Sequence, residues 1–429
     1  MKRAIRRLAA FLCVVAAVTF GLIGYGGVML PDTLAVTRPE LAVPNAPYTA
    51  VLAYSSEETP TSKQQAVNSA EFSLTQLSSA AAEEPTLVQD GEAAAPEEQE
   101  LSAAYKLLGI FPVKNAKVKV TQRSYVVVGG QVFGIKLYTK GVLVAKTDVV
   151  MTDSGNENPS QKAGLHAGDI ITHINGKEVS RKQDISEAVA NSDGKPLKLT
   201  VQRDGEPRVL TLEPVKGSGG KYLVGLWIRD SSAGIGTVTF YDTQSNTMAG
   251  LGHAIVDVDT GEVLPTSGGE LVDARIMGVY KGAAGKPGEL CGIFQDKELA
   301  KLKLNSEMGV YGKMVFTPEG ELTPVATRSE VKPGYAQIVS TIGDDGTQLF
   351  DAEILKVNQN AAGATKNMTI RITDERLISA TGGIVQGMSG SPILQDGMLV
   401  GAVTHVFVNS PLEGYGIFAE TMLETARNL

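Results

Sequence analysis

The chain has 429 residues, which is the usual length of two or three domains. With 43 % hydrophobic and 20 % charged residues it can bury a core over most of its length, which excludes a disordered protein. The formal net charge of −8 argues against a nucleic-acid partner, because a surface of this sign repels polyphosphate. Only two cysteines are present, which excludes a disulfide framework and a cysteine metal cluster, and we expect neither a metal nor another cofactor.

The N-terminus carries the pattern of a membrane anchor. Residues 8–30 form 23 positions without a charge, enough for a helix to cross a bilayer, and Lys2, Arg3, Arg6 and Arg7 precede them. We therefore expect residues 1–30 to be an uncleaved transmembrane anchor with an exported chain behind it. A cleaved signal peptide is the alternative, although no convincing cleavage site follows the apolar stretch.

Residues 31–104 are expected to form an exported segment that contains a flexible linker. Between residues 55 and 100 the composition changes to Ala, Glu, Ser, Gln and Pro, and this stretch alone carries a net charge of −9. The remaining chain is close to neutral, so the acidity belongs to the linker. Its backbone would be accessible to a protease, including the protein itself.

The middle of the chain, residues 105–215, resembles a PDZ domain of the kind attached to bacterial proteases. The resemblance rests on A-G-L-x-A-G-D-I-I at residues 163–171, followed by I-N-G at 174–176. It implies that a peptide end adds as a strand beside a glycine-hydrophobic loop, for which Gly134, Ile135, Lys136 and Leu137 are the candidates. The alternative is a module that packs on its neighbour and binds nothing.

Residues 216–429 contain short apolar runs at turn-punctuated spacing, which predict an all-β barrel or double barrel. Within them, Ser389 lies in the stretch Gln386-Gly-Met-Ser-Gly-Ser-Pro392, where small residues let a substrate backbone approach. The backbone N–H groups of Gly387, Met388 and Ser389 are candidate oxyanion donors. A serine hydroxyl needs a base. Of the four histidines, His166 and His173 fall in the PDZ-like region, so His253 is the candidate base by elimination and by context.

The serine motif is similar to the Q-G-D-S-G-G-P of chymotrypsin-like proteases. Together with the anchor, the PDZ-like module and G-L-G-H-A-I at residues 250–255, it resembles the S55-type serine peptidases of endospore-forming bacteria. The resemblance implies that Asp374, in Thr373-Asp374, is the third catalytic residue. Asp257 and Asp273 are competitors, and Asp374 can also be read as a turn residue.

Two further residues depart from, or add to, the chymotrypsin-like pattern. Met388 has no charge to pair with a new N-terminus, so control through PDZ contacts or self-cleavage is expected instead, as the family resemblance implies. His405 follows the nucleophile by 16 residues, where the wall of a specificity pocket is formed, and is a candidate for recognising an acidic or amide side chain. An ordinary strand histidine is the alternative.

The sequence thus predicts a mainly β protein with an N-terminal transmembrane helix, an acidic linker, a PDZ-like α+β module and a chymotrypsin-like double β-barrel serine protease domain. Its expected activity is that of a serine endopeptidase acting on proteins, and no H-E-x-x-H motif supports a metalloprotease. The resemblance further implies cleavage of a membrane-bound regulator between the two forespore membranes, leading to late sigma-factor activation. The rival from another class is an anchored PDZ adaptor with an inactive protease-like domain.

Overall fold

The computed structural model describes residues 2–30, 32–36, 48–54, 101–120, 122–359 and 365–429. The predicted acidic linker at residues 55–100 lies outside the described residues. The chain divides into two compact units, one built mainly from residues up to 119 and the other from residue 120 onward.

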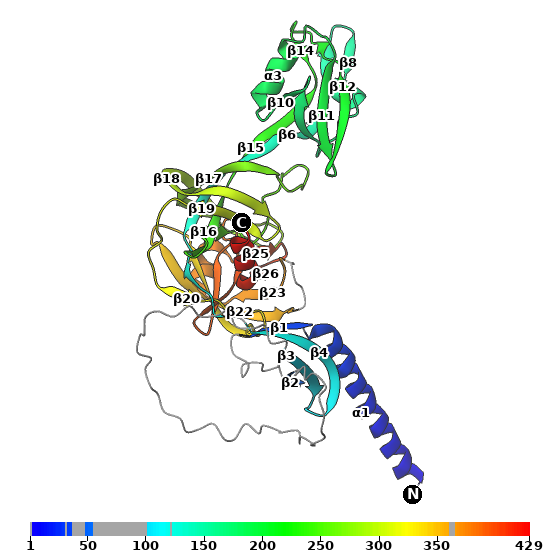
Figure 1. Cartoon of the computed structure of the whole chain (residues 1–429), viewed down its shortest axis with the longest axis vertical. Coiled ribbons are helices and arrows are strands. Elements are labelled where there is room, and N and C mark those ends of the chain that lie inside the picture. Colours follow the sequence, from blue (N-terminus) through cyan, green and yellow to red (C-terminus); the bar gives the residue numbers. More distant parts are fainter. Residues whose placement is uncertain (1, 31, 37–47, 55–100, 121, 360–364) are drawn as a thin grey trace, which may run out of the picture. The chain divides into compact units, whose positions relative to one another are not determined.

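The first unit contains the helix α1 (Lys2–Met29) and a four-stranded sheet (Figure 1). The strand order is β1-β4-β3-β2, with β1 at Thr33–Val36, β2 at Tyr48–Tyr54, β3 at Leu101–Leu107 and β4 at Phe111–Val120. β3 and β4 form a hairpin, and Leu108 and Gly109 in its turn both have positive φ. The predicted start of the PDZ-like module at residue 105 therefore falls inside this sheet.

Helix α1 is anchored to the sheet near its C-terminal end. The hydroxyl of Tyr48 donates a hydrogen bond to the carbonyl of Leu22 over 2.7 Å. Within the described part of the chain, no helix has both the length and the apolarity needed to cross a membrane. The transmembrane anchor stays a prediction from the sequence.

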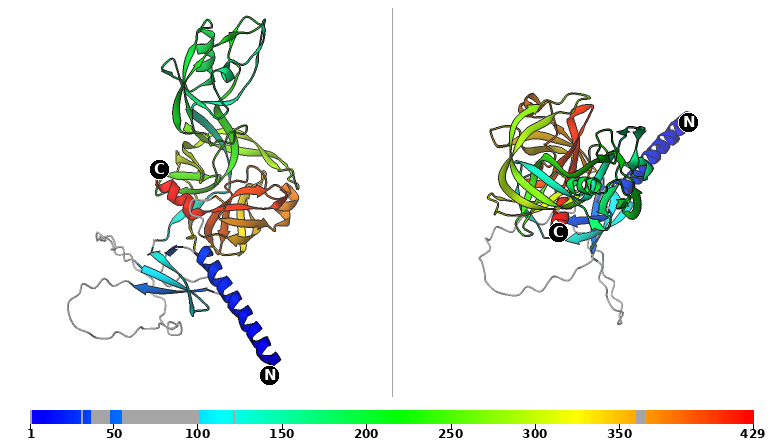
Figure 2. Two further views of the ribbon diagram at one scale, coloured as in Figure 1. Left: turned by 90° about the vertical axis from the view of Figure 1, so that its right-hand side faces the viewer. Right: turned by 90° about the horizontal axis from the view of Figure 1, so that it is seen from above.

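The second unit is built around two six-stranded antiparallel barrels, which Figure 2 shows side by side. In the first barrel, neighbouring strands pair in the order β6-β17-β18-β19-β16-β15, and β15 pairs back with β6 to close the ring. Its strands are β6 (Val132–Thr147), β15 (Leu226–Asp242), β16 (Thr247–Gly250), β17 (Thr266–Tyr280), β18 (Glu289–Ser306) and β19 (Gly309–Met314). Phe133, Leu137 and Leu271 are fully buried in its core.

The second barrel closes in the order β21-β22-β23-β26-β25-β24. Its strands are β21 (Gly334–Thr341), β22 (Thr347–Val357), β23 (Met368–Ile372), β24 (Pro392–Gln395), β25 (Met398–Phe407) and β26 (Ser410–Phe418). Ile338, Ile370 and Ile393 fill its core, and the final helix α5 (Ala419–Arg427) buries Met422 and Ala426 in a further cluster. β5 (Tyr125–Val128) and β20 (Leu322–Pro324) extend the sheet of the first barrel beyond β15. The predicted double β-barrel is confirmed.

The PDZ-like module is inserted between the first two strands of the first barrel. β6 and β15 are both long. The last part of β6 pairs with the first part of β15, as in Lys146 with Trp227, and it also pairs with β9 (Ile170–Ile174). The module adds α2 (Pro159–Lys162), α3 (Lys182–Ala190), β11 (Leu197–Arg203), β12 (Glu206–Leu212) and the short strands β7 (Val150–Thr152), β8 (Gly155–Glu157), β10 (Lys177–Glu178), β13 (Val215–Lys216) and β14 (Tyr222–Leu223).

This insertion replaces the predicted boundary between residues 215 and 216. The protease-like part contains the first half of β6 as well as everything that follows the module. Local sequence patterns mark where strands occur, but pairing partners far apart in the chain decide to which barrel a strand belongs.

Candidate active site

The two predicted reactive side chains are carried by loops that touch each other. His253 follows β16 of the first barrel, and Ser389 lies in the turn between α4 (Glu375–Thr381) and β24 of the second barrel. A β-carbon at Gly390 would collide with the carbonyl oxygen of Thr237 and lie 2.5 Å from the amide nitrogen of Leu251. One at Gly252 would lie 3.0 Å from the side chain of Thr404. Gly390 therefore lets the serine turn pack on the backbone of the histidine loop, and Gly252 lets that loop lie close to β25.

The serine turn is fastened to β15 by two buried threonines that the sequence motif did not reveal. The Thr237 hydroxyl donates to the carbonyl of Gly387 over 2.8 Å, and the Thr237 amide donates to the carbonyl of Ser389 over 2.9 Å. The Thr239 hydroxyl donates to the carbonyl of Gly390 over 2.8 Å. Alternate residues of one strand face the same side, so Thr237 and Thr239 together hold the turn from the neighbouring barrel.

The serine hydroxyl is in a resting orientation. It donates to the carbonyl of Thr404 over 2.8 Å, and no hydrogen bond joins it to His253 among the residues described. Reaching the imidazole requires a change of rotamer at Ser389, and catalytic hydrogen bonds are often incomplete before substrate binds.

The imidazole of His253 has a defined tautomer. Its Nδ1 donates to the carbonyl of Ala254 over 2.8 Å, so Nε2 carries the lone pair that can accept a proton. The ring of His405 lies against it, with 4.9 Å between ring centroids and 38° between planes. His405 is therefore a neighbour of the candidate base.

The electrostatic surroundings of the two imidazoles favour their neutral forms. Burial lowers the pKa of His253 below its usual 6.5, and the Ala254 carbonyl and the charge of Glu307 oppose this shift. Burial, followed by repulsion from His253 and Lys366, lowers the pKa of His405 to about 4. A neutral imidazole is the form that acts as a general base.

We expect a direct consequence in the pH dependence of hydrolysis. Because the pKa of His253 is lowered, more than half of this side chain stays neutral at pH 6.5, and kcat/KM is expected to fall only at lower pH. A pH profile of kcat/KM for a peptide substrate measures this, with circular dichroism recorded at each pH to separate it from unfolding. An acid limb centred above pH 6.5 would contradict the expectation.

The predicted set of three oxyanion donors is reduced to two. The Met388 amide donates to the carbonyl of Val385 over 3.1 Å, and its side chain is fully buried, so this N–H is already used inside the turn. The amides of Gly387 and Ser389 have no acceptor within the described ranges. These two are free to bind an oxyanion, and Gly387 keeps a φ of 94° that favours glycine.

The structure does not bring Asp374 to the imidazole, which corrects the assignment that the family resemblance implied. Asp374 is the N-cap of α4 and accepts hydrogen bonds from the backbone and guanidinium of Arg376 and from the amide of Asp351. The hydroxyl of Tyr335 also binds Asp351, which places this corner beside the start of β21. Ser391, next to the nucleophile turn, contacts Ser340 near the other end of β21. At the usual rise per residue, Tyr335 and Ser340 are about 16 Å apart along this strand.

The contacts of Asp374 are those of a structural carboxylate. Hydrogen bonding from Arg376 lowers its pKa to about 2. We expect Asp374→Ala to lower the free energy of unfolding at pH 7 by about 1 kcal/mol through loss of the cap, and Asp374→Asn by less, because asparagine also caps helices. The ion pair adds little, since the Arg376 side chain is 65 % exposed.

The sign of the pH effect follows from the depressed pKa. The carboxylate contributes stability above its unfolded pKa near 3.8, and this contribution is lost as pH falls toward 2. Urea unfolding of both variants at pH 7 and at pH 3 measures it, with peptide hydrolysis assayed in parallel. Loss of roughly 10⁴-fold in kcat in Asp374→Asn with unchanged stability would restore Asp374 as the triad acid.

The two competing aspartates are also engaged elsewhere. Asp257 is buried, pairs with Arg229 over 3.0 Å and accepts from the backbone of residues 259 and 260. Asp273 accepts from the amide of Ala274 and lies near the Tyr241 hydroxyl. Across the described residues, no group of histidine, cysteine and acidic side chains is placed to hold a metal ion.

The predicted peptide-binding loop is wrong. Gly134, Ile135, Lys136 and Leu137 lie in the barrel half of β6 and pair with β15 on one edge and β17 on the other. Ile135 and Leu137 are buried in the barrel core, and a β-carbon at Gly134 would lie 2.5 Å from the ring of Phe294. A strand paired on both edges cannot accept a peptide strand. The glycine-hydrophobic pattern recurs in many strands, so it identified the wrong one.

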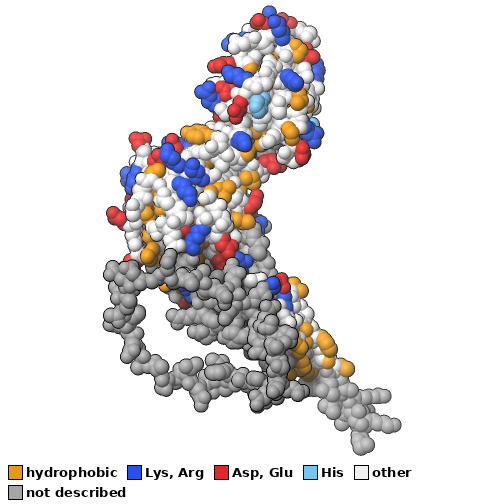
Figure 3. Space-filling view, viewed as in Figure 1, with side chains coloured by type: hydrophobic (Ala, Val, Ile, Leu, Met, Phe, Trp, Pro, Cys, Tyr) orange, Lys and Arg blue, Asp and Glu red, His pale blue; other side chains and the backbone are white. Residues whose placement is uncertain are grey.

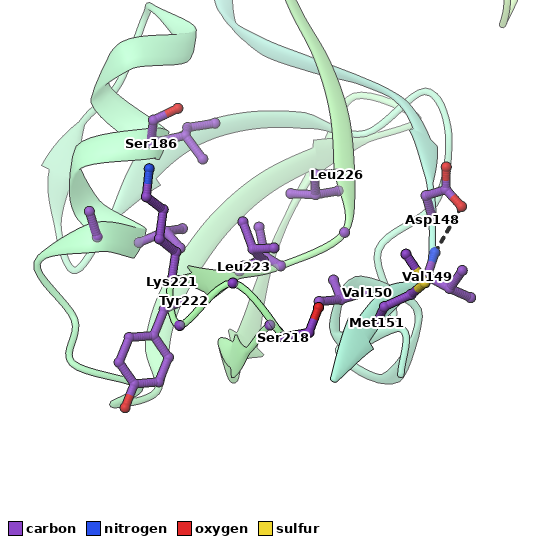
Figure 4. A pocket seen from close by; sticks show the side chains of 18 of the residues that line it. Asp148, Val149, Val150, Met151, Ser186, Ser218, Lys221, Tyr222, Leu223 and Leu226 are labelled. Carbon is purple, nitrogen blue, oxygen red and sulfur yellow. Dashed lines mark hydrogen bonds between the residues drawn. The ribbon is translucent and has the colours of Figure 1, made fainter. Parts of the chain in front are cut away.

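The module instead has a groove between α3 and the segment from Gly217 to Ile228, with a volume of about 1110 Å³. Ser186 on α3 faces Lys221, Tyr222, Leu223 and Leu226 across it, and Val149 and Met151 line the other end (Figure 4). The signal that sequence reasoning missed is the run Gly217-Ser-Gly-Gly-Lys-Tyr-Leu-Val-Gly225, in which glycines precede hydrophobic residues directly before β15.

Comparison with known proteins identifies two successive regions of the chain. Residues 220–423 match the family model described as SpoIVB peptidase S55, and residues 109–213 match the PDZ domain model. Protease RseP of Yersinia pestis is 42 % identical over 62 residues, which is 14 % of each chain. A DegP-like periplasmic serine endoprotease of Brucella suis is 29 % identical over 120 residues, 27 % of this chain and 23 % of that protein. The chain thus spans less than a quarter of the length of either relative.

Among solved structures, a protease of M. tuberculosis in its active form is similar at 13 % identity and a TM-score of 0.27. The match covers 45 % of this chain and 72 % of the other.

Proposed function

We propose a reaction for this chain on the premise that residues 220–423 belong to the SpoIVB peptidase S55 family, so that the chain is a serine peptidase carrying a PDZ domain. Ser389 attacks the carbonyl carbon of a peptide bond and its proton moves to Nε2 of His253. The amides of Gly387 and Ser389 hold the oxyanion. The imidazolium then protonates the leaving amine, and water releases the acyl group from Ser389 in the reverse sequence.

The contact between the serine turn and the histidine loop carries this proposal. The backbone of Gly390 packs against that of Leu251. Ser389 directly precedes Gly390, and His253 follows Leu251 by two residues. This spacing brings both side chains to the same junction between barrels. His405 lies beside the imidazole, and we keep it as a proposed specificity residue whose neutral ring can donate a hydrogen bond to an acidic or amide side chain.

The substrate class follows from the module as well as from the site. The groove beside α3 has the form that takes an extended peptide as an added strand against the start of β15. We propose that a protein substrate or a segment of it binds there and that this binding controls cleavage. Cleavage of a membrane-bound regulator in the space between the forespore membranes, and self-cleavage in the acidic linker, rest on the family resemblance alone.

We also propose that residues 8–30 anchor the chain in a membrane. The support is the uncharged run, its basic N-terminal flank and the exposure of apolar side chains along α1, visible in Figure 3. The exposed apolar residues of this helix include Val14, Val18, Phe20 and Val28. An apolar surface of this kind is stable in lipid rather than in water.

A phosphonylating reagent specific for activated serines tests the proposed reaction. The full chain is incubated with it and digested, and the modified residue is located by mass spectrometry. We expect one adduct, on Ser389, that is absent from Ser389→Ala, together with hydrolysis of a protein substrate by the wild type only. A chain that stays unlabelled and cleaves nothing would instead support the inactive PDZ adaptor.

A further inference from the structure

The acid that partners His253 is left open once Asp374, Asp257 and Asp273 are found in other contacts. The first barrel brings one of its turns against the histidine loop. His253 follows the third strand of this barrel, β16, and the fifth and sixth strands, β18 and β19, are joined by Glu307 and Met308 alone. Because Gly250 pairs with Val310, the end of β16 lies against the start of β19.

The short turn between β18 and β19 is in direct contact with the histidine loop. A β-carbon at Gly309 would lie 2.7 Å from the carbonyl oxygen of Gly250 and 3.1 Å from the amide nitrogen of Gly252. Glycine is required there by this close approach and by a φ of 130°. The turn that carries Glu307 thus packs on Gly250 and Gly252, which lie just before His253.

A buried asparagine joins the same strand end to the residues after His253. The Asn305 side-chain oxygen accepts from the Ile255 amide over 2.8 Å, and its nitrogen donates to the Ile255 carbonyl over 2.9 Å. The same nitrogen donates to the carbonyl of Leu264 over 2.9 Å. The histidine loop is therefore held on both sides of His253 by the end of β18 and the turn that follows.

We propose that Glu307 is the positioning acid for the His253 imidazole, an inference that rests on the proposed peptidase reaction. The chain order is then histidine, acid, serine, as in chymotrypsin-like triads. The Ala254 carbonyl holds the Nδ1–H tautomer in the resting state, and the Glu307 carboxylate stabilises the imidazolium formed when Nε2 takes the proton of Ser389.

The charged groups around His253 are consistent with this role. From the β18–β19 turn, Glu307 is the carboxylate that raises the pKa of His253 against the effect of burial. From β25, His405 lies against the ring, and Lys366 acts electrostatically on His405, so these neighbours are neutral or positive. Glu307, an exposed carboxylate, therefore supplies the negative charge that an imidazolium needs here.

The test compares the full wild-type chain with Glu307→Gln, Glu307→Asp and the matched surface control Glu319→Gln. Two readouts are recorded: the rate of phosphonylation of Ser389 between pH 5 and 8, and the titration of the His253 ring by NMR with isotope-labelled histidine. Only four histidines are present, and a His253→Ala sample assigns the resonance.

In Glu307→Gln we expect phosphonylation to slow by about 100-fold and the His253 midpoint to fall by about one pH unit, since a nearby negative charge is removed. Glu307→Asp should recover part of both effects, and Glu319→Gln should change neither. An unchanged His253 titration in Glu307→Gln would overturn the inference, whatever the rate. A shifted titration in a chain whose serine is never labelled would support the Glu307–His253 pairing while refuting the peptidase reaction.

Discussion

Replacing His253 with alanine is expected to lower kcat/KM for peptide hydrolysis by roughly 10⁶-fold without unfolding the protein. In the resting state the Ser389 hydroxyl donates to the Thr404 carbonyl, which is not a base, and His405 lies against the imidazole of His253. A serine hydroxyl without a base stays protonated at neutral pH. The measurement is steady-state hydrolysis of a short peptide that does not depend on the PDZ groove.

His166→Ala is the matched control for this experiment. His166 is an exposed residue of the PDZ-like module, so the same change of side chain there should leave hydrolysis unaltered. Thermal unfolding of both variants should remain within a few degrees of the wild type. If His253→Ala retained a tenth or more of the wild-type rate, the imidazole would not be the base and the proposed reaction would fail.

Replacing Gly390 with alanine is expected to have the second largest effect, a loss of at least about 100-fold in kcat/KM. The new β-carbon would collide with the Thr237 carbonyl and come within 2.5 Å of the Leu251 amide, and both are backbone atoms that cannot move aside separately. The serine turn would then be pushed away from the histidine loop. The φ of 95° adds roughly 1–3 kcal/mol of strain for a residue with a side chain.

Gly397→Ala separates the two causes. Gly397 has a φ of 75° in the turn between β24 and β25, but nothing lies within 4 Å of a β-carbon there. We expect Gly397→Ala to lower the free energy of unfolding by about 1 kcal/mol and to leave the activity unchanged. Activity and urea unfolding of both variants decide the question, and equal losses of activity would show that the packing of the two loops is not what aligns the site.

Much of the organisation could be predicted because it depends on local patterns. Short apolar runs between glycines mark strands wherever they pair, and the number of such runs predicts an all-β barrel or a double barrel. The serine motif is recognisable because a tight turn with close backbone approach needs small residues at fixed positions, as Gly387 and Gly390 show. His253 could be found because so few histidines exist in the chain.

The errors have a common physical origin. Ile135 and Leu137 look the same in sequence whether a strand lies at an open edge or between two partners, and here they are enclosed by β15 and β17. Met388 has an ordinary backbone amide, and only the turn geometry shows that Val385 uses it. Asp374 stands near Ser389 in the chain, yet the cap of α4 directs its carboxylate to Arg376.

The sequence by itself determined that this chain is a mainly β protein with a PDZ-like module, and it identified Ser389 and His253 as the candidate nucleophile and base. These properties depend on residue type and short spacing, which the chain carries locally. Only the tertiary structure decided that the module interrupts the first barrel, that Thr237 and Thr239 fasten the serine turn, and that the turn carrying Glu307 packs on the histidine loop while Asp374 caps α4. Those properties depend on which strands pair across more than a hundred residues, and strand pairing is settled by the closure of the whole sheet.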